Sequence, residues 1–555
     1  MKREILILAS FLLNGLCYAQ PFLVYRGVYN TASFMPPGIP GGAIARGSTF
    51  AIFGRNFSPA ATPPLSFPLP NTLGGVSITV TQGTTVLNAI PVGLSAGQIN
   101  AIMPSNTPLG MVSVQVTFNN AKSNPLPVRV VNSAFGIFAA NSAGIGPGIL
   151  QNFVSAGEQP INSLQTPARA GQAITLWGTG LGPASFADNV APSPVSLPIQ
   201  TEVFVGGVTA PLLYNGRSPC CAGIDQIVFQ VPANAPLGCW VPVYVRSGGA
   251  AVSNFVTMAI SADGAACTEP ANAIATPLIN GSKTALYLAA KLAVHHDIGV
   301  RTVRDATTEL FSGYQAEEKQ GPFNFNPMFS LPPAGACTLY TPTGDISRDD
   351  ASIIAGMTPP KGRGLDAGAV TLTGSKGTRT SVASLYPGIT GVQLAGAIPS
   401  LPLTNTTFLD PGTFQLNGAG GKDVGNFTAS MDVPAPLSWT NRDQITNINR
   451  AAALTVNWTG AAANNSVFVV GANADLPSNS TAVFLCMAAP GATSLTVPPA
   501  VLANIPPTRT RVIQSKGSLY VGQWNLTSPA KFSATGIDVG YLLNALVSGK
   551  TVTFQ

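Results

Sequence analysis

The sequence predicts an all-β protein made of tandem β-sandwiches, followed by a further β-rich region of one or two sandwich-like units. Two observations come from an internal duplication: residues 98–110 (QINAIMPSNTPLG) echo residues 226–238 (QIVFQVPANAPLG), and residues 46–54 echo residues 169–178. The third observation is a composition rich in turn residues. Self-similarity at this spacing indicates two modules of about 125 residues each.

The composition supports a folded β protein and argues against two classes of partner. Gly and Pro account for 58 and 48 of the 555 residues, and 45% of the residues are hydrophobic, so the chain can bury several cores. Charged residues make up only 9%, and the net charge of +6 is spread thinly. No Lys/Arg run with interleaved aromatic residues occurs, so nucleic acid and membrane surfaces are not expected partners.

The N-terminus has the pattern of an export signal. Lys2 and Arg3 precede an apolar run at 5–13, and Cys17-Tyr18-Ala19 forms a small-residue cleavage site before Gln20. We therefore expect residues 1–19 to be a cleaved signal peptide and the protein to be extracellular or on the cell surface. Acylation of Cys17 is the alternative, but Leu16 stands where a lipoprotein needs a small residue. No later stretch has the roughly 18 uninterrupted apolar residues of a transmembrane segment.

Short alternating runs rich in β-branched residues, bounded by Gly, Pro, Asn and Ser, predict the strands of both modules. We expect Gln98 to match Gln226, and Pro104 to match Pro232, with each proline ending a strand. The expected strands are 48–54, 76–82, 98–103 and 112–118 in the first module, and 173–178, 201–208, 226–231, 240–246 and 253–260 in the second.

Five short motifs that occur in order carry a resemblance to a known family. They are Gly27–Phe34, Ile52–Gly54, Leu73–Val76, Ala96–Asn100 and Phe135–Phe138. With these motifs the chain resembles the duplicated IPT/TIG-like modules of secreted acidobacterial (Solibacter-type) proteins. The resemblance implies immunoglobulin-like sandwiches at about 24–133 and 134–262, and it implies no activity.

The second half of the chain continues with strand-like runs and turns. We expect a β-rich region at 268–437 and a C-terminal immunoglobulin-like domain at 438–555. Four Asp-x-Gly tripeptides predict turns in which the aspartate caps the turn and the glycine takes a positive φ. Calcium is the alternative, but these aspartates are solitary, whereas a calcium loop supplies several ligands. The runs are Val370–Thr373, Thr413–Leu416, Leu454–Trp458, Val467–Val470 and Val483–Cys486, and the aspartates are Asp366, Asp410, Asp423 and Asp538.

Six cysteines remain after the signal, and an even number in an exported chain predicts disulfides. Zinc is the alternative, but the only histidines, His295 and His296, lie near no closely spaced pair of thiols. The six are Cys220, Cys221, Cys239, Cys267, Cys337 and Cys486.

The expected strand geometry predicts how these cysteines pair. We expect strands 226–231 and 240–246 to form a hairpin, which separates Cys239 from Cys220 and Cys221 by roughly 20 Å, too far for a bridge. Strand 253–260 returns beside the start of strand 240–246, so Cys267 comes close to Cys239. The expected pairs are therefore Cys239 with Cys267, Cys220 with Cys221, and Cys337 with Cys486.

Two patterns that can indicate catalysis are weak in this chain. Gly93–Gly97 (GLSAG) matches a nucleophile elbow, but a strand follows it where the elbow needs a helix, so we expect a turn. Titratable groups gather at 295–318, where paired carboxylates could act on a glycosidic bond. Adjacent histidines point to opposite faces of a strand, so we favour a solvated sheet edge. The group is His295, His296, Asp297, Asp305, Glu309, Glu317 and Glu318.

The sequence thus indicates an exported, multi-domain β-sandwich protein with a structural, adhesive or ligand-binding role outside the cytoplasm. The alternative is a secreted carbohydrate-binding or carbohydrate-active protein, in which Trp439, Trp458 and Trp524 could stack on sugars. Burial in sandwich cores is the competing interpretation of these tryptophans. We expect no catalytic, cofactor or metal site, and a polysaccharide or another cell-surface protein as partner.

Overall fold

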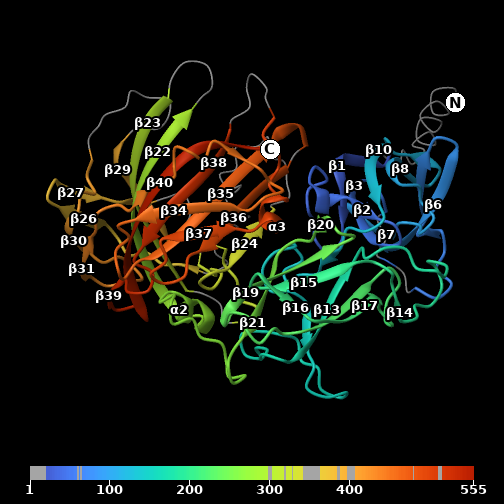
Figure 1. Cartoon of the computed structure of the whole chain (residues 1–555), viewed down its shortest axis with the longest axis horizontal. Coiled ribbons are helices and arrows are strands. Elements are labelled where there is room, and N and C mark those ends of the chain that lie inside the picture. The colour runs from blue at the N-terminus through green and yellow to red at the C-terminus, as the bar shows by residue number, and fades with distance from the viewer. Residues whose placement is uncertain are drawn as a thin grey trace, which may run out of the picture.

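The computed structural model is nearly all β and confirms the predicted fold class. It describes residues 20–58, 62, 65–297, 303–317, 321–327, 329–341, 363–383, 388–396, 407–478, 480–509 and 516–555. The expected signal peptide and Glu318 lie outside the described residues. Within them, α-helix is confined to α2 (Ala275–Asn280) and α3 (Pro499–Leu502). Figure 1 shows the two N-terminal modules beside a larger C-terminal half, with the second module contacting both.

Module 1 is a sandwich whose two sheets share one bent strand. The strand β6 pairs with β5 through its first half and with β7 through its second half. A bulge between Pro91 and Gly93 bends β6 between the sheets. One sheet has the order β1 (Phe22–Asn30), β3 (Thr49–Arg55), β7 (Gln98–Ile102), β6 (Thr85–Leu94), and the other β6, β5 (Val76–Gln82), β8 (Gly110–Phe118), β10 (Leu126–Val131), β2 (Ile44–Ala45), with β4 (Thr72–Leu73) and β9 (Ala121–Lys122) beside β5 and β8.

Module 2 repeats this plan with the bent strand broken in two. Pro211 lies between β16 and β17, where it lacks the N–H that a continuous ladder would use. One sheet contains β11 (Gly136–Ile137) and β12 (Leu150–Asn152) beside β13 (Ala173–Thr179), then β18 (Asp225–Gln230), β17 (Leu212–Arg217) and β14 (Val195–Ser196). The other contains β16 (Val208–Ala210), β15 (Thr201–Val205), β19 (Gly238–Ser247), β20 (Ala251–Val252) and β21 (Val256–Ile260).

The strand register confirms that the repeated sequence segments occupy matching positions in the two sandwiches. Gln98 lies opposite Phe53 in module 1, and Gln226 lies opposite Trp177 in module 2. The bulge of β6 recurs between Leu212 and Tyr214. Pro104 and Pro232 follow β7 and β18, as expected. The two copies therefore agree residue by residue along these strands.

The structure contains the three expected disulfides, although one step that led to them is wrong. Strands 226–231 and 240–246 do not form a hairpin: β18 pairs with β13 and β17, whereas β19 pairs with β15, β20 and β21. The connecting loop crosses from one sheet to the other, as sandwich connections commonly do. The returning strand was predicted correctly, because β21 runs antiparallel to β19 with Gly238 opposite Ile260. The bridges are Cys220–Cys221, Cys239–Cys267 and Cys337–Cys486.

The C-terminal half is built on one 12-stranded sheet that crosses the expected boundary at residues 437 and 438. Two smaller sheets pack on it over separate cores, one around Tyr287 and Phe414 and one around Trp458 and Phe484. The long strand β40 joins the two parts, because it pairs with β38 on one side and with β22 on the other. The two cores therefore share a single sheet.

The main path of the large sheet runs β24 (Cys337–Tyr340), β36 (Ser480–Met487), β35 (Ser466–Asp475), β38 (Gly517–Trp524), β40 (Val539–Phe554), β22 (Lys283–Asp297), β23 (Val303–Glu317), β29 (Ile389–Gly396), β28 (Val382–Ala383). Off this path, β25 (Arg363–Gly364) pairs with β23, and β33 (Asn447–Ile448) and β39 (Ala530–Phe532) pair with β40. The small sheets are β27 (Gly377–Thr380), β26 (Val370–Gly374), β30 (Gly412–Gly418), β31 (Phe427–Val433), and β32 (Ser438–Trp439), β34 (Leu454–Thr459), β37 (Ser494–Val497).

Candidate functional site

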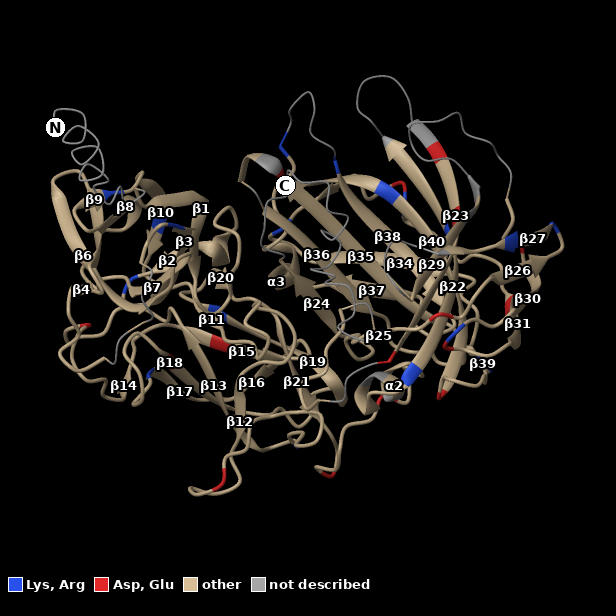
Figure 2. Ribbon diagram, turned by 180° about the vertical axis from the view of Figure 1, so that it is seen from behind, with Lys and Arg blue, Asp and Glu red and all other residues tan. Residues whose placement is uncertain are grey.

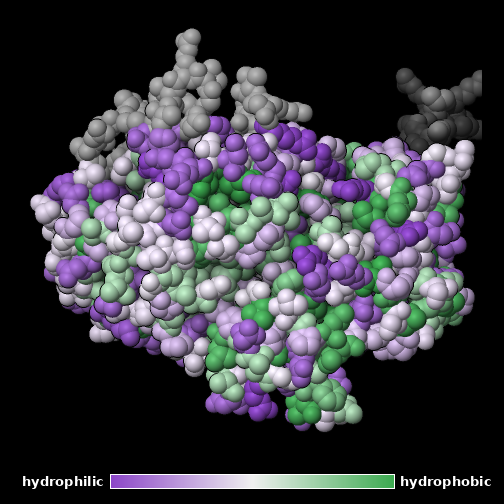
Figure 3. Space-filling view, viewed as in Figure 1, coloured by the Kyte–Doolittle hydropathy of each residue, from purple (hydrophilic) through white to green (hydrophobic). Residues whose placement is uncertain are grey.

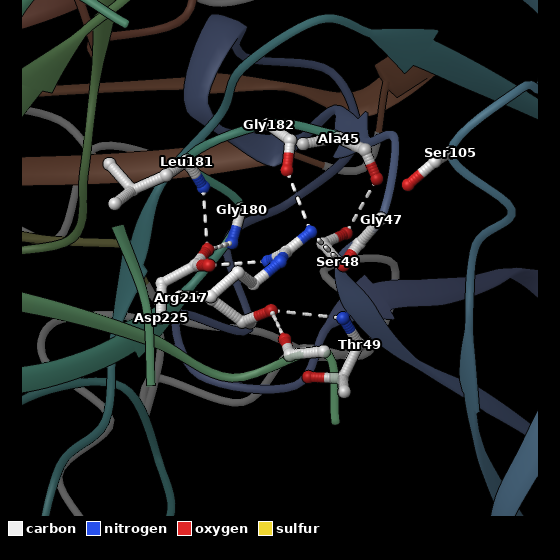
Figure 4. Close-up of polar contacts among 12 residues, drawn as sticks. Ala45, Gly47, Ser48, Thr49, Ser105, Gly180, Leu181, Gly182, Arg217 and Asp225 are labelled. Atoms are coloured by element: carbon white, nitrogen blue, oxygen red, sulfur yellow. Dashed lines mark hydrogen bonds and ion pairs between the residues drawn. The ribbon is translucent and has the colours of Figure 1, made fainter. Parts of the chain in front are cut away.

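The two modules meet at a buried, hydrogen-bonded ion pair. Arg217 at the end of β17 pairs with Asp225 at the start of β18, and both side chains are almost fully buried. The Arg217 guanidinium also donates to the carbonyl oxygens of Gly47 in module 1 (2.8 Å) and Gly182 in module 2 (2.7 Å). Figure 4 shows Arg217 reaching between the two chain segments. One side chain thus ties both modules together.

The second oxygen of Asp225 is also occupied. Its Oδ2 accepts hydrogen bonds from the N–H groups of Gly180 and Leu181, both at 2.7 Å. Burial raises the pKa of the Asp225 carboxyl above its ordinary value, although Arg217 and the two N–H groups act in the opposite direction. Thr179 completes the contact, because its Oγ1 accepts from the N–H of Thr49 in module 1 (2.9 Å). This network fixes the relative orientation of the modules.

Beside this junction lies an open groove of about 930 Å³, here called the junction groove. Its floor is the outer face of the β1, β3, β7 and β6 sheet of module 1, and its far wall comes from two loops of module 2. It is lined by Thr31, Ala32, Phe34, Thr49, Phe53, Leu65, Phe67, Leu69, Val92, Gln98, Asn100, Phe138, Ala139, Ser142, Ala143, Cys221, Ala222 and Ile224.

The groove combines aromatic rings with amide groups and contains no charge among the described residues that line it. Phe67 is 46% exposed, and the ring centroid of Phe34 lies 6.3 Å from that of Phe53 on β3. Gln98 donates to the Oδ1 of Asn100 (2.8 Å), which orients both amides on the floor. Such a surface suits an uncharged ligand that presents both apolar faces and hydroxyl groups.

Two non-glycine residues of the groove have left-handed backbone. Phe34 has φ +48° and Ser142 has φ +56°, one in each module. Such a conformation is unfavourable for residues with a side chain, and it occurs preferentially at ligand-binding positions. Phe34 is held there by a hydrogen bond from its N–H to the carbonyl of Asn30 (3.1 Å). Both walls are therefore held in set conformations.

The bridge between Cys220 and Cys221 lies on the rim of the groove. Both residues are exposed, and they belong to the 218–224 loop that connects Arg217 to Asp225. The Oγ of Ser218 accepts from the N–H of Cys220 (3.0 Å), and the N–H of Ile224 donates to the carbonyl of Cys221 (3.2 Å). The loop that forms the wall is thus closed by a covalent bond and anchored by the ion pair.

The expected solvated sheet edge is wrong for Glu309 but holds at the end of the hairpin. Strand β29 pairs with β23 only at Thr308–Tyr314, which makes Glu309 interior, whereas Asp305 is 80% exposed and lies where β23 has no second partner strand among the described residues. His295 pairs with Asp305 across the hairpin (2.8 Å), while Glu309 is fully buried and binds Lys291 at 3.1 Å. His296 lies opposite Arg304. These groups are therefore distributed along the hairpin in separate pairs and do not form one site.

Glu309 has a visible structural role in that region. Its Oε2 accepts the N–H groups of Phe408 (2.5 Å) and Leu409 (2.9 Å), so it fastens the 407–412 segment to the hairpin. Glu317 lies at the opposite end of β23 and contacts Arg363 at 3.4 Å. Lys291 lies directly opposite Glu309 in the β22–β23 pairing. A prediction of this hairpin register would have indicated that the two charges form an ion pair.

The other sequence candidates have mixed outcomes. Ser95 lies in an exposed turn before β7, as expected. Trp439 and Trp458 are buried, with exposures of 7% and 1%, so they are not available for stacking on a sugar. Among the described residues, no group of three or more His, Cys, Asp or Glu side chains is placed to hold a metal ion.

The Asp-x-Gly prediction is correct at one turn and wrong at two others. Asp366 accepts the N–H of Gly368 (2.8 Å), and Gly368 has φ +68°. Gly425 and Gly540 do not have a positive φ. Gly540 lies within β40 and packs under the ring of Phe532, which explains why a side chain is excluded there.

The residues that build the junction and its groove were not among the candidates predicted from the sequence. Arg217 and Asp225 are eight residues apart, and nothing in the local pattern marks them as partners. The available signal was weak: charged residues make up only 9% of the chain, and a buried charge needs a partner, but neither residue lies within a strand predicted from the sequence. Figure 2 shows how sparsely charge is distributed over the molecule.

Comparison with known proteins identifies no family for this chain. No protein-family model and no curated protein matches it. A solved tetra-tandem repeat from the extending region of a large adhesion protein shares 11% identity, covers 92% of this chain and 97% of its own, and has a TM-score of 0.12. At TM-scores as low as these, the likenesses assign no site.

Two further solved structures are similar to parts of the chain. SGBP-B of the Bacteroides ovatus mixed-linkage glucan utilization locus, in complex with a mixed-linkage heptasaccharide, shares 11% identity over 39% of this chain and 45% of its own, with a TM-score of 0.19. Domains 5–6 of the S-layer protein SbsC share 13% identity over 44% of this chain and 99% of their own, with a TM-score of 0.16. Separately, no helix among the described residues is long and apolar enough to cross a membrane.

Proposed function

We propose that the protein is an exported β-sandwich protein that binds neutral carbohydrate, without cleaving it, in the junction groove. The observation that carries this proposal is the lining of the groove, which offers rings and amides but no charge among its described residues. A charged ligand would lose hydration there without gaining a counter-ion, which is unfavourable. A neutral sugar presents apolar ring faces to aromatic side chains and hydroxyl groups to amides.

Three disulfides support a location outside the cytoplasm, because such bonds persist in oxidising compartments. The resemblance to secreted proteins with duplicated IPT/TIG-like modules supports the same location. The rigid junction supports a binding role, since a groove with walls that are already fixed loses little conformational entropy when a ligand enters.

A glycan array that displays both neutral and acidic saccharides tests this function. We expect neutral glycans to bind, and we expect their affinity to be insensitive to salt, since no ion pair contributes. Incubation of the bound glycan with the protein should release no new reducing ends. Binding of acidic glycans alone, or release of reducing ends, would contradict the proposal.

Variants then localise the site. Phe67→Ala and Asn100→Ala should each weaken binding by about fivefold, because each removes one ring or amide contact worth about 1 kcal/mol. Phe153→Ala is the matched control, since Phe153 is 48% exposed in module 2 and lies outside the groove. If all three variants bind like the unaltered protein, the groove is not the site.

A further inference from the structure

A second, larger cleft of about 1120 Å³ lies between module 2 and the C-terminal half. The cleft is lined by segments 236–238, 260–263, 265–266 and 268–272, and by segments 331–334, 458–467, 487–493 and 526–528. Most lining residues are Ala, Pro, Gly and Thr, so the few polar groups within it stand out. This cleft is separate from the junction groove.

The most prominent of these groups is the carboxylate of Glu269. The side chain is only 9% exposed, and its Oε1 accepts the N–H of Cys239 at 2.5 Å. Any side chain at Gly238 would press on this oxygen, since a Cβ there would lie 2.8 Å from it. The carboxylate is therefore held in place by the first residues of strand β19, at the Cys239–Cys267 bridge.

An unpaired acceptor lines the same cleft. Asn272 is 5% exposed, and its Nδ2 donates to the carbonyl of Phe329 (2.9 Å), which leaves the Oδ1 without a hydrogen bond. Across the cleft, the Nδ2 of Asn465 is also buried and unpaired. Buried polar atoms are normally hydrogen-bonded, so the Oδ1 of Asn272 is an acceptor that a donor bound in the cleft would satisfy.

The charge of the cleft is one-sided. Asp263 and Glu269 are the charged residues among the described residues that line it, and no Lys, Arg or His lines it, although the whole chain has a net charge of +6. Arg169 packs against the neighbouring Gly264 from outside the lining. A cationic ligand in this cleft would therefore lie near carboxylate and amide oxygens, and no positively charged side chain among the described lining residues would repel it.

We propose that this cleft binds a protonated alkyl amine, of the kind carried by a lysine side chain or a polyamine, between Glu269 and the Oδ1 of Asn272. A compact ammonium with three donors suits this arrangement, because the Glu269 carboxylate already accepts the N–H groups of Cys239 and Trp240 and cannot offer the paired acceptors that a guanidinium fork prefers.

The ionisation of Glu269 gives the site a pH signature. Burial raises the pKa of Glu269 to about 7, while the N–H groups of Cys239 and Trp240 act in the opposite direction. Asp263 lines the cleft from the same loop, and Arg169 lies behind Gly264. An alkyl amine stays protonated from pH 5.5 to 8, so its affinity should follow the ionised fraction of Glu269, which rises roughly 30-fold over that range.

Calorimetric titration of the full chain tests the site. The probes are Nα-acetyl-lysine methylamide and putrescine, each compared with its amine-acetylated counterpart. At pH 8 we expect at least one amine to bind at least tenfold more tightly than its acetylated form. Comparison of the two amines shows whether the cleft prefers a lysine side chain or a free diamine. At pH 5.5 that preference should largely disappear.

Variants connect the binding to the residues. Glu269→Gln keeps an acceptor for the N–H of Cys239 but removes the charge, so it should abolish both the preference for the amine and its pH dependence. Glu158→Gln, an exposed carboxylate of module 2, is the matched control and should change neither. Peptide mapping that finds the Cys239–Cys267 bridge intact verifies the fold.

Two results would overturn the site: no preference for either amine, or a preference that survives in Glu269→Gln. If Glu269→Gln does not fold, the pH series on the unaltered protein decides, because pH-independent amine binding contradicts a role for Glu269. These outcomes are distinct from those of the glycan experiments, since they do not involve the junction groove.

Discussion

Modules 1 and 2 share a strand order, but only module 2 carries disulfides and a buried ion pair among the described residues. Gly97 faces Gly54 in module 1 where Asp225 lies opposite Gly178 in module 2. Met111, which is 58% exposed, stands where module 2 has Cys239, which is 2% exposed. The first copy shows that the sandwich needs neither feature. Both additions lie where module 2 contacts its neighbours.

This comparison divides the stabilising interactions into those of the sandwich and those of the junctions. A Ser-Asn pair illustrates the shared part: Ser123 and Ser253 each accept the N–H of a valine, Val116 at 3.0 Å and Val245 at 2.9 Å. Asn124 and Asn254 follow them and bind the first strand of their own module. We therefore expect equal effects at the shared positions and unequal effects at the junctions.

The largest effect is expected at the ion pair. Arg217→Met leaves Asp225 buried without its partner and should lower the free energy of unfolding by about 3–5 kcal/mol. Arg129→Met, at an exposed arginine of β10 in module 1, is the control and should change it by less than about 0.5 kcal/mol. Denaturant unfolding followed by tryptophan fluorescence measures both. Similar small losses would mean that the junction does not depend on this pair.

Removal of the Cys239–Cys267 bridge comes next. The bridge closes a segment with a sequence separation of 28, so the Cys239→Ser, Cys267→Ser double variant should lose about 3–4 kcal/mol. Met111→Ser at the equivalent position of module 1 should be almost neutral, because that side chain is exposed. Thermal unfolding without reductant compares the two; an equal loss would refute the assignment of the bridge to the junction.

The pH dependence of stability is the third contrast. Glu269 has a pKa of about 7 in the folded chain, above its ordinary value of 4.5, so its ionisation opposes folding. Its contribution is fully present below pH 4.5 and is lost as the pH rises through 7, by about 3 kcal/mol at pH 8. Glu269→Gln should remove this fall. Unfolding curves of both proteins from pH 4 to 8 measure the difference, and parallel curves would contradict it.

The smallest effect tests the shared part. Ser123→Ala and Ser253→Ala each remove the acceptor of a buried N–H and should each lower stability by about 1–2 kcal/mol. Because the hydrogen bonds match in the two modules, the losses should agree within about 0.5 kcal/mol. Hydrogen exchange at the amides of Val116 and Val245 locates each effect. A large inequality would show that the modules are not equivalent at this position.

Local pattern was sufficient to predict several strands of the two modules, although β1, β6, β10 and β17 were not predicted. Alternation over 76–82 marks β5 with its exact bounds, because one face of that strand is buried and the other is not. Pairing between distant segments was not predictable in the same way. The hairpin expected between 226–231 and 240–246 failed because a short loop can either turn back within one sheet or cross to the other, and the sequence of the loop does not distinguish these choices.

The junction groove could not be predicted, because its residues come from two modules and are ordinary within each. Gln98 and Asn100 look like the alternate residues of an edge of a sandwich, and Phe138 like the end of a strand. What unites them is the orientation imposed by Arg217 and Asp225, which is a property of packing. Figure 3 shows the same mixture at the surface, where hydrophobic residues are scattered among polar ones and gather most visibly over the lower part, where module 2 lies.

The place of β40 in the large sheet has a consequence for the order in which the chain acquires structure. The N–H of Lys283 at the start of β22 is bonded to Asp538, 255 residues later, and β40 runs parallel to β22 from there. Until β40 arrives, the inner flank of β22 and that of β38 are unpaired edges, which readily join other chains. Assembly of this sheet therefore depends on β40, and pairing between segments so far apart in the sequence is slow to form.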